Sequence, residues 1–344
     1  MENDCLFADI LLPVNTKFEE RDIATDCMGG QFRLILNEKQ AIKPVGESKS
    51  DYEIVCMIAE KMGLLQEYTG GKSIDDLVKS GFENSGVKDR ITFAEFEEKG
   101  YYVVSTDTKW EEQPTGLIGF YTDPEKHPLK TPSGKIEFYS QNLAQHFPDD
   151  AERPPVPHWI EKGISHDENR SGERAKKYPL LMISNHGRWR VHANHDDISW
   201  LREIPTCKVK GADGYYYEPL WVNPLDAQKR GIKSGDVVKV SNERGGVLAG
   251  ARITERIIPG AVYMDHGARY DPIVPGELDR GGAINTIVPH NTTSKNATGM
   301  AVSGFLVEVE GVRIHELMQK YPEAFGRSYD PAAGLRLERA IASD

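Results

Sequence analysis

The chain has 344 residues, of which 39% are hydrophobic and 28% charged, so it is long enough for two domains and a substantial core. Its 42 Lys and Arg residues against 53 Asp and Glu residues give a net charge of −11, which argues against a general nucleic-acid-binding or anionic-membrane-binding surface. No apolar run approaches the length of a membrane span, and the four cysteines include no C-x-x-C pair that would hold zinc or an iron–sulfur cluster. Any site for an anion must therefore be local.

The first 66 residues have the pattern of the closing half of an α/β unit. We expect a strand over Leu6–Val14 that is apolar enough to lie inside a parallel sheet, whose other strands would come from neighbouring sequence. A strand of this kind at the start predicts that the chain is a fragment. Apolar residues at helical spacing over Asp51–Gly63, with Gly63 as the stop, predict a helix.

Residues 67–177 are predicted to form a mixed connecting region that ends in a linker. Helical pieces are expected at Ile74–Phe82 and Phe93–Gly100. Thr131–Ser140 is expected to form a hairpin, with a turn at Pro132–Gly134 and a strand over Lys135–Tyr139.

From residue 178 to 311 the pattern changes to short β-segments separated by Gly and Pro, which favours a small closed barrel, and residues 312–344 follow as a helical tail. A short helix is expected from Pro224 to its stop at Gly231, and a hairpin turn over Asn242–Gly246. The expected strands are Leu180–Ile183, Leu220–Val222, Val237–Ser241, Val247–Ile253, Ala261–Met264 and Phe305–Val309.

The loop after the first barrel strand carries the densest set of candidate site residues. Two arginines offer planar forks for phosphate, and a glycine lets the backbone approach a ligand closely. We therefore interpret the loop as half of a cradle for a nucleotide or cofactor, although a solvated loop has the same composition. The candidates are Ser184, Asn185, His186, Gly187, Arg188, Arg190, His192 and His195.

A metal site is the alternative use of this loop. His186, His192 and His195 offer imidazoles, but their H-x5-H-x2-H spacing matches no established metal signature, so we assign no metal ligand. Two further candidates for the cofactor face are Asp213, beside three consecutive tyrosines, and Asn296, in the polar loop Thr292–Gly299.

Three segments resemble the C-terminal part of the molybdopterin oxidoreductases of the dimethyl sulfoxide reductase family. They are FADILLPVNTKFEERD, TPSGKIEFYS and the long segment NPLDAQKRGIKSGDVVKVSNERGGVLAGARITERIIPGAV. Within the family, PVGESKSDYEI, DRGGAINTIVP and GMAVSGFLVEVE look most like the large subunits of pyrogallol–phloroglucinol transhydroxylases. The resemblance implies an end piece of an α/β third domain, followed by a mostly β domain that is a double-psi β-barrel.

The resemblance also implies a cofactor, bis-molybdopterin guanine dinucleotide with Mo or W, whose guanosine tails the barrel buries. In this reading Ser184, His186, Arg188, Arg190 and His192 would meet pterin and phosphate groups. A second loop, Asp279–Asn285, would complete the cradle. By the same resemblance, Asn285 would form a hydrogen bond with a pterin edge, and Arg280 would offer a positive charge to the cofactor. Gly281 and Gly282 would let the backbone approach the cofactor closely.

The family keeps its metal ligand and its catalytic acids and bases in the first two domains, so we assign no catalytic residue here. The implied partners are missing N-terminal catalytic domains and an iron–sulfur electron-transfer subunit, with no nucleic acid and no direct membrane insertion. The transhydroxylase resemblance favours the cytoplasm, whereas a twin-arginine signal in a missing N-terminus would place the protein in the periplasm. The competing readings are a stand-alone molybdopterin-binding module or insertion factor, and a metalloenzyme built on the three histidines.

Overall fold

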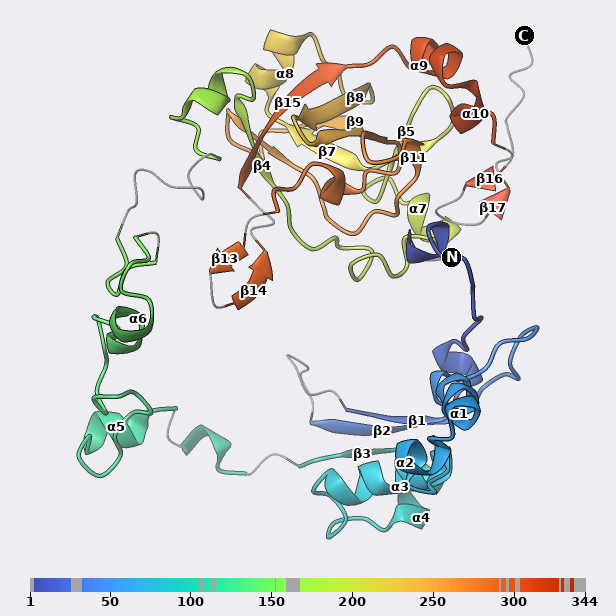
Figure 1. Ribbon diagram of the computed structural model, residues 1–344, viewed down its shortest axis with the longest axis vertical. Helices are drawn as coiled ribbons and strands as arrows, with labels where there is room; N and C mark the ends of the chain where they lie inside the picture. Colours follow the sequence, from blue (N-terminus) through green and yellow to red (C-terminus); the bar gives the residue numbers. More distant parts are fainter. Residues whose placement is uncertain are drawn as a thin grey trace. The chain divides into compact units, whose positions relative to one another are not determined.

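The computed structural model describes residues 3–25, 33–105, 108–112, 116–151, 153–158, 168–290, 292–294, 297–300, 304–327, 329–330 and 335–336. The chain divides into two compact units (Figure 1). One unit contains residues 8–128, and the other contains residues 1–7 and 129–344. Within the described residues, no helix has both the length and the apolar character needed to cross a membrane.

The unit of residues 8–128 is a small antiparallel sheet with helices. The sheet has the order β1 (Asp22–Thr25), β2 (Leu34–Glu38), β3 (Tyr101–Val103). Its core gathers Ile35, Phe82, Val87 and Phe96. The helical elements are η2 (Lys17–Glu19), α1 (Asp51–Met62), α2 (Leu65–Thr69), α3 (Ile74–Asn84), α4 (Phe93–Lys99), η3 (Trp110–Glu112) and α5 (Ile118–Thr122).

The predicted helices of this unit are confirmed, and local sequence explains their bounds. Ser50 begins α1 through a capping box with Glu53, and Thr92 begins α4 in the same way with Glu95. Gly63 ends α1 with φ of 74°, in the left-handed region that favours glycine.

The predicted strand over Leu6–Val14 is wrong. A short 3₁₀ helix, η1 (Asn3–Leu6), is followed by irregular chain, and only Val14 makes a β-bridge, to Lys49. Ile10 is 78% exposed. An apolar run forms a strand only where a partner strand completes its backbone hydrogen bonds. Among the described residues no strand pairs with residues 8–13, and only the Pro13 carbonyl accepts a hydrogen bond, from the Lys49 N–H next to the Val14 bridge.

The predicted strand over Lys135–Tyr139 is wrong for the same reason. The turn before it forms, since the Gly134 N–H donates to the Thr131 carbonyl at 3.0 Å. Residues 135–139 have no partner strand within the part of the chain that the structure describes, and Phe138 is 83% exposed.

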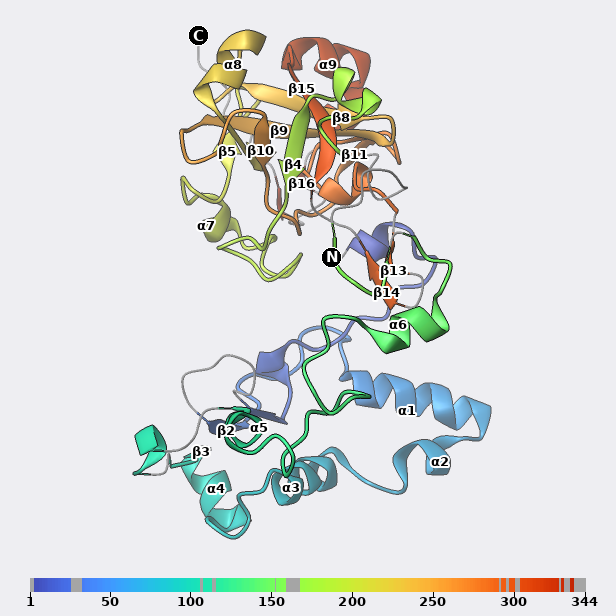
Figure 2. The same cartoon turned by 90° about the vertical axis from the view of Figure 1, so that its left-hand side faces the viewer.

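The six strands predicted in the C-terminal half are confirmed, and they close into a mixed barrel (Figure 2). Around the ring the order is β9, β7, β10, β4, β15, β8, and pairing of β8 with β9 completes it. The pairs β10–β4 and β7–β9 are parallel, whereas the others are antiparallel. The bounds are β4 (Leu180–Ile183), β7 (Pro219–Val222), β8 (Val237–Asn242), β9 (Gly245–Ile253), β10 (Ala261–Tyr263) and β15 (Phe305–Gly311).

The barrel interior is packed with apolar side chains, as the apolar β-segments predict. Met182, Leu220, Val262 and Phe305 are among the side chains that are fully buried. Strands β11 (Pro272–Val274) and β12 (Leu278–Asp279) extend the sheet from β9, and the sequence did not predict them.

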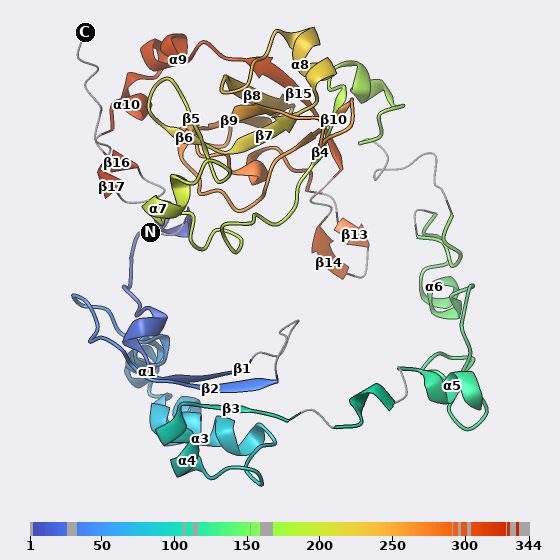
Figure 3. The ribbon, with the colours of Figure 1, turned by 180° about the vertical axis from the view of Figure 1, so that it is seen from behind.

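The same unit contains shorter elements besides the barrel strands, several of them labelled in Figure 3. They are α6 (Gln141–His146), η5 (Glu173–Lys176), α7 (Ser199–Arg202), β5 (Val209–Lys210), β6 (Tyr216–Tyr217), α8 (Pro224–Arg230), η6 (Ile284–Thr286), β13 (Thr292–Ser294), β14 (Ala297–Met300), α9 (Ile314–Lys320), α10 (Pro322–Phe325), β16 (Tyr329–Asp330) and β17 (Leu335–Arg336). The expected helix over Pro224–Arg230 is confirmed, and Gly231 ends it with φ of 66°.

Strand directions place several loops at one end of the barrel. Strands β4 and β10 are parallel, and β8 runs the same way as β4 because both are antiparallel to β15. The loops that leave β4 and β10 therefore lie at the same end of the barrel as the β8–β9 turn and the start of β7. This end contains the candidate functional site.

Candidate functional site

The loop after β4 and the loop after β10 are held side by side by a continuation of their parallel pairing. The Met264 N–H donates to the Ile183 carbonyl at 3.1 Å, and the His266 N–H donates to the Asn185 carbonyl at 3.0 Å. An isolated β-bridge then joins His186 to His266. The sequence reading missed His266, although the polar stretch from Asp265 to Asp271 directly after a predicted strand carries the same signal as the first loop.

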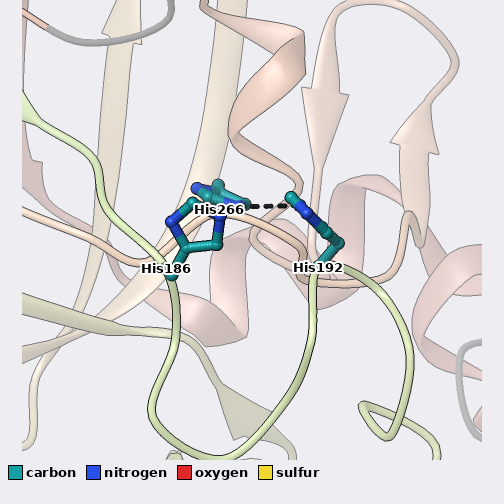
Figure 4. Close-up of side chains that lie close together, drawn as sticks. All are labelled: His186, His192 and His266. Carbon is teal, nitrogen blue, oxygen red and sulfur yellow. Dashed lines mark hydrogen bonds between the residues drawn. The ribbon is translucent and has the colours of Figure 1, made fainter. Parts of the chain in front are cut away.

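Three imidazole rings meet at this point (Figure 4). The ring centroids of His186 and His266 lie 4.5 Å apart, and His192 lies 5.0 Å from His186 and 5.1 Å from His266. His266 Nε2 and His192 Nδ1 share a hydrogen bond of 3.1 Å. Partial burial lowers the pKa of His266, and the neighbouring His186, His192 and Arg190 lower it further.

The chain path holds His192 in a conformation that is uncommon for its residue type. His192 has φ of 52°, and Gly267 passes directly beneath it with φ of 90°. A Cβ atom on Gly267 would lie only 1.9 Å from the His192 carbonyl oxygen. Only glycine permits this approach, so the two loops are packed backbone against backbone.

Below the histidines lies a buried network of two cations and two anions. Arg190 makes a two-pronged ion pair with Glu218, at 3.0 and 2.8 Å, and Lys208 Nζ lies 2.7 Å from both Glu218 and Asp196. Burial would lower the pKa of Arg190, but the carboxylates of Glu218, Asp196 and Asp265 together outweigh this effect and raise it. Arg190 also donates to the His266 carbonyl at 2.8 Å. Arg190 therefore links the loop after β4 to the loop after β10 from within the protein, and its guanidinium does not face solvent.

The solvent face of the first loop carries the side chains that can reach a ligand. Asn185, His186, Arg188, His192 and His195 are exposed, and Ser184 and Gly187 are half-buried. The loop from Ser184 to His195 contains no acidic residue. Such a face presents N–H donors without a competing carboxylate, which suits a phosphate or another polar anion.

The second predicted loop, residues 279–285, is organised around the buried carboxylate of Asp279. This carboxylate accepts three backbone hydrogen bonds of 2.7 Å, from Asp271, Gly282 and Ala283. Burial raises the pKa of Asp279 to about 6, although the backbone donors act in the opposite direction. Asn285 stands exposed in η6 at the end of the loop, where its amide is accessible.

The two predicted loops share a support. A Cβ on Gly282 would lie 2.5 Å from Glu218 Cβ, and a Cβ on Gly281 would lie 2.0 Å from the Arg269 carbonyl oxygen. Both glycines thus allow the second loop to pack against the protein's own chain. Since Glu218 also pairs with Arg190 of the first loop, one buried residue contacts both.

Arg280 and Asp213 form a separate buried pair on the flank of the second loop. They lie 2.9 Å apart, and the Arg280 guanidinium stacks 4.0 Å from the Tyr215 ring centroid and 4.5 Å from that of Phe325. The Tyr217 hydroxyl donates to Asp213 at 2.8 Å. Their charges are therefore already paired. The remaining predicted residue, Asn296, lies outside the described residues.

The raised pKa of Asp279 gives the stability of the barrel a pH dependence. Its ordinary value is 3.8 and its folded value about 6, so between these values the folded state binds more protons than the unfolded state. The contribution of Asp279 to the free energy of unfolding is thus complete below pH 4 and is lost as the pH rises through 6. About two pKa units correspond to roughly 3 kcal/mol.

An Asp279→Asn variant, which cannot titrate, isolates this contribution. We expect the free energy of unfolding of the variant, relative to that of the natural chain, to increase by about 3 kcal/mol between pH 3 and pH 7. Urea titrations of both proteins at a series of pH values measure it. Parallel stability profiles for the two proteins would show that Asp279 ionises normally.

Comparison with known proteins places this site in a recognised domain. Residues 180–304 match the family described as the molydopterin dinucleotide binding domain, and residues 1–61 match the family described as molybdopterin oxidoreductase. The first match contains both predicted loops.

Curated relatives match nearly the whole chain. Dimethyl sulfoxide reductase DmsA of Escherichia coli is 33% identical over 323 residues, covering 91% of this chain and 37% of the relative. The pyrogallol hydroxytransferase large subunit of Pelobacter acidigallici is 34% identical over 346 residues, covering 90% of this chain and 38% of the relative. The chain thus spans less than two fifths of the length of these relatives. Among solved structures, acetylene hydratase from Pelobacter acetylenicus matches with a TM-score of 0.61 at 19% identity, over 91% of this chain and 39% of that one, which supports the fold.

Proposed function

Because the chain belongs to the molybdopterin oxidoreductases of the dimethyl sulfoxide reductase family, we propose that it is the C-terminal, cofactor-binding part of such an enzyme. The cofactor that this family implies is bis-molybdopterin guanine dinucleotide with Mo or W. The observation that carries the proposal is the donor-rich, acid-free loop from Ser184 to His195 at the end of the closed barrel.

The residues present fit a dinucleotide tail. His186, Arg188 and His192 offer exposed N–H groups to phosphate oxygens, and the Asn285 amide offers both a donor and an acceptor to a heterocycle edge. Arg190 positions the His266 backbone through its hydrogen bond from below. When bound, the metal of the cofactor supplies oxygen or hydroxyl transfer, and this chain supplies binding and orientation.

The reaction of the whole enzyme is proposed from its relatives. One of them is named a pyrogallol hydroxytransferase, so we favour hydroxyl or oxygen transfer, with a phenolic aromatic as a candidate substrate. The catalytic groups would come from N-terminal domains, with an iron–sulfur subunit as electron partner. We propose a cytoplasmic location, by analogy with the transhydroxylases.

Arg188→Ala in the complete enzyme tests the proposal. We expect its affinity for the dinucleotide to fall by about tenfold or more, because a charge-assisted hydrogen bond to phosphate would be lost. The measurement is GMP released by acid hydrolysis, together with molybdenum or tungsten, per polypeptide. Arg313→Ala is the matched control, because the Arg313 side chain is 84% exposed at the start of α9 and pairs only with Glu316 among the ion pairs described. Unchanged GMP and metal contents in Arg188→Ala would rule out a phosphate contact at this residue.

A further inference from the structure

The three histidines at the end of the barrel have the composition of a metal-ligand set. Each can offer one ring nitrogen, and these nitrogens all lie within 4.8 Å of one another. Three nitrogens bound to one ion at about 2.0–2.1 Å in tetrahedral geometry would lie roughly 3.3 Å apart. The ring nitrogens would therefore have to move closer together, from at most 4.8 Å to roughly 3.3 Å, and rotation of the side chains can supply this movement.

The backbone around the three rings is fixed, so a ligand would not have to organise it. His186 and His266 occupy bridged positions of two paired segments. The His266 carbonyl accepts hydrogen bonds from Arg190 Nε at 3.0 Å and Nη2 at 2.8 Å. The His192 backbone packs against Gly267, where an added Cβ atom would lie 1.9 Å from the His192 carbonyl oxygen. Preorganisation of this kind reduces the entropic cost of binding.

The buried charges beneath the rings are largely paired. Arg190 and Lys208 pair with Glu218 and Asp196, while Arg202 also acts on Asp196, and Asp265 on Arg190. His186 and His192 are exposed, which leaves a path for an ion and room for a water molecule as a fourth ligand.

From this arrangement we propose that, in the chain without its dinucleotide, His186, His192 and His266 bind one divalent cation of the zinc class, with a fourth position open to solvent. Imidazole favours zinc, copper, nickel and cobalt, whereas magnesium and calcium require oxygen ligands that this set lacks. The hydrogen bond between His192 Nδ1 and His266 Nε2 gives way on binding, and the proton that it holds moves to the outer nitrogen of its ring or to solvent. His195, which the sequence grouped with His186 and His192, is not in the cluster.

Zinc titration of the full chain, prepared without a polyhistidine tag or added cofactor, tests the site. The decisive pair of variants is His192→Asn and His195→Asn, because both positions have positive φ, 52° and 74°, which asparagine tolerates. By calorimetry we expect one Zn²⁺ per natural chain and per His195→Asn chain. His192→Asn should raise the Kd by more than about 100-fold, because losing a ligand costs more than losing the partner of a ligand, which costs roughly 10- to 100-fold.

Two further measurements make the outcome decisive. Zinc should raise the Tm of the natural chain and of His195→Asn, but not that of His192→Asn, whose Tm without zinc reports whether it folds. His266→Gln should behave as His192→Asn does. Absence of zinc binding by the natural chain, or equal weakening by His195→Asn, would overturn the proposal. Since no dinucleotide is present, this result is independent of the GMP content of the Arg188 variant.

Discussion

Replacing Glu218 by alanine is expected to lower the free energy of unfolding of the barrel-containing unit by about 3–5 kcal/mol. Glu218 is 0% exposed, and its carboxylate accepts hydrogen bonds from Arg190 and Lys208. Without it, the two buried cations would keep Asp196 as their ion-pair partner, with the Asp265 carboxylate near Arg190. Removing one partner of a buried ion pair leaves the other charge without a partner or water, and this strongly lowers the free energy of unfolding.

Glu243→Ala is the matched control for Glu218→Ala. Glu243 also pairs with arginine. Its two carboxylate oxygens accept from Arg174 Nη2 at 2.8 and 2.7 Å, and Arg244 lies 3.3 Å away, but the Glu243 side chain is 45% exposed. Water can replace this interaction, so the expected loss is below about 1 kcal/mol. Urea unfolding of both variants gives the comparison. Similar losses for the two variants would show that the Glu218 network is not shielded from water.

Gly267→Ala is expected to cost about 2–5 kcal/mol. A left-handed backbone conformation costs an alanine roughly 1–2 kcal/mol, and an added methyl group in a packed region costs about 1–3 kcal/mol more. Here that methyl carbon would lie 1.9 Å from the His192 carbonyl oxygen, so one of the two loops must move. We also expect the variant to lose the arrangement of the three histidines.

Gly276→Ala separates the two contributions. Gly276 has φ of 76°, and a Cβ atom there would meet nothing within 4 Å, so only the conformational cost of roughly 1–2 kcal/mol applies. The two variants are compared by their urea midpoints at neutral pH. If Gly267→Ala were no less stable than Gly276→Ala, the close packing of the loops would be disproved.

Local sequence signals predicted the parts of the fold that depend on local interactions. Apolar residues at helical spacing predicted α1, α3 and α4, with Gly63 as the stop of α1, and short apolar segments separated by Gly and Pro predicted the six barrel strands. The strands at Leu6–Val14 and Lys135–Tyr139 failed because strand formation depends on a partner that local sequence does not reveal. The domain boundaries predicted at residues 66, 177 and 311 stay predictions.

The candidate site was only partly readable from the sequence. The composition of Ser184–His195 indicated the loop, but it could not distinguish the exposed Arg188 from Arg190, which is buried against Glu218. His266 is 74 residues from His192 in sequence, and it joins the site only because β10 pairs with β4. Residue type suggests a chemical role, whereas long-range strand pairing decides which side chains meet.

The most direct test of the central claim is an experimental structure of the complete enzyme with its cofactor bound. The proposal expects a phosphate or pterin group of the dinucleotide within hydrogen-bonding distance of Arg188 and of His186 or His192, with Arg190 still paired to Glu218. A dinucleotide bound away from the loops that leave β4 and β10, with these side chains free in solvent, would contradict it.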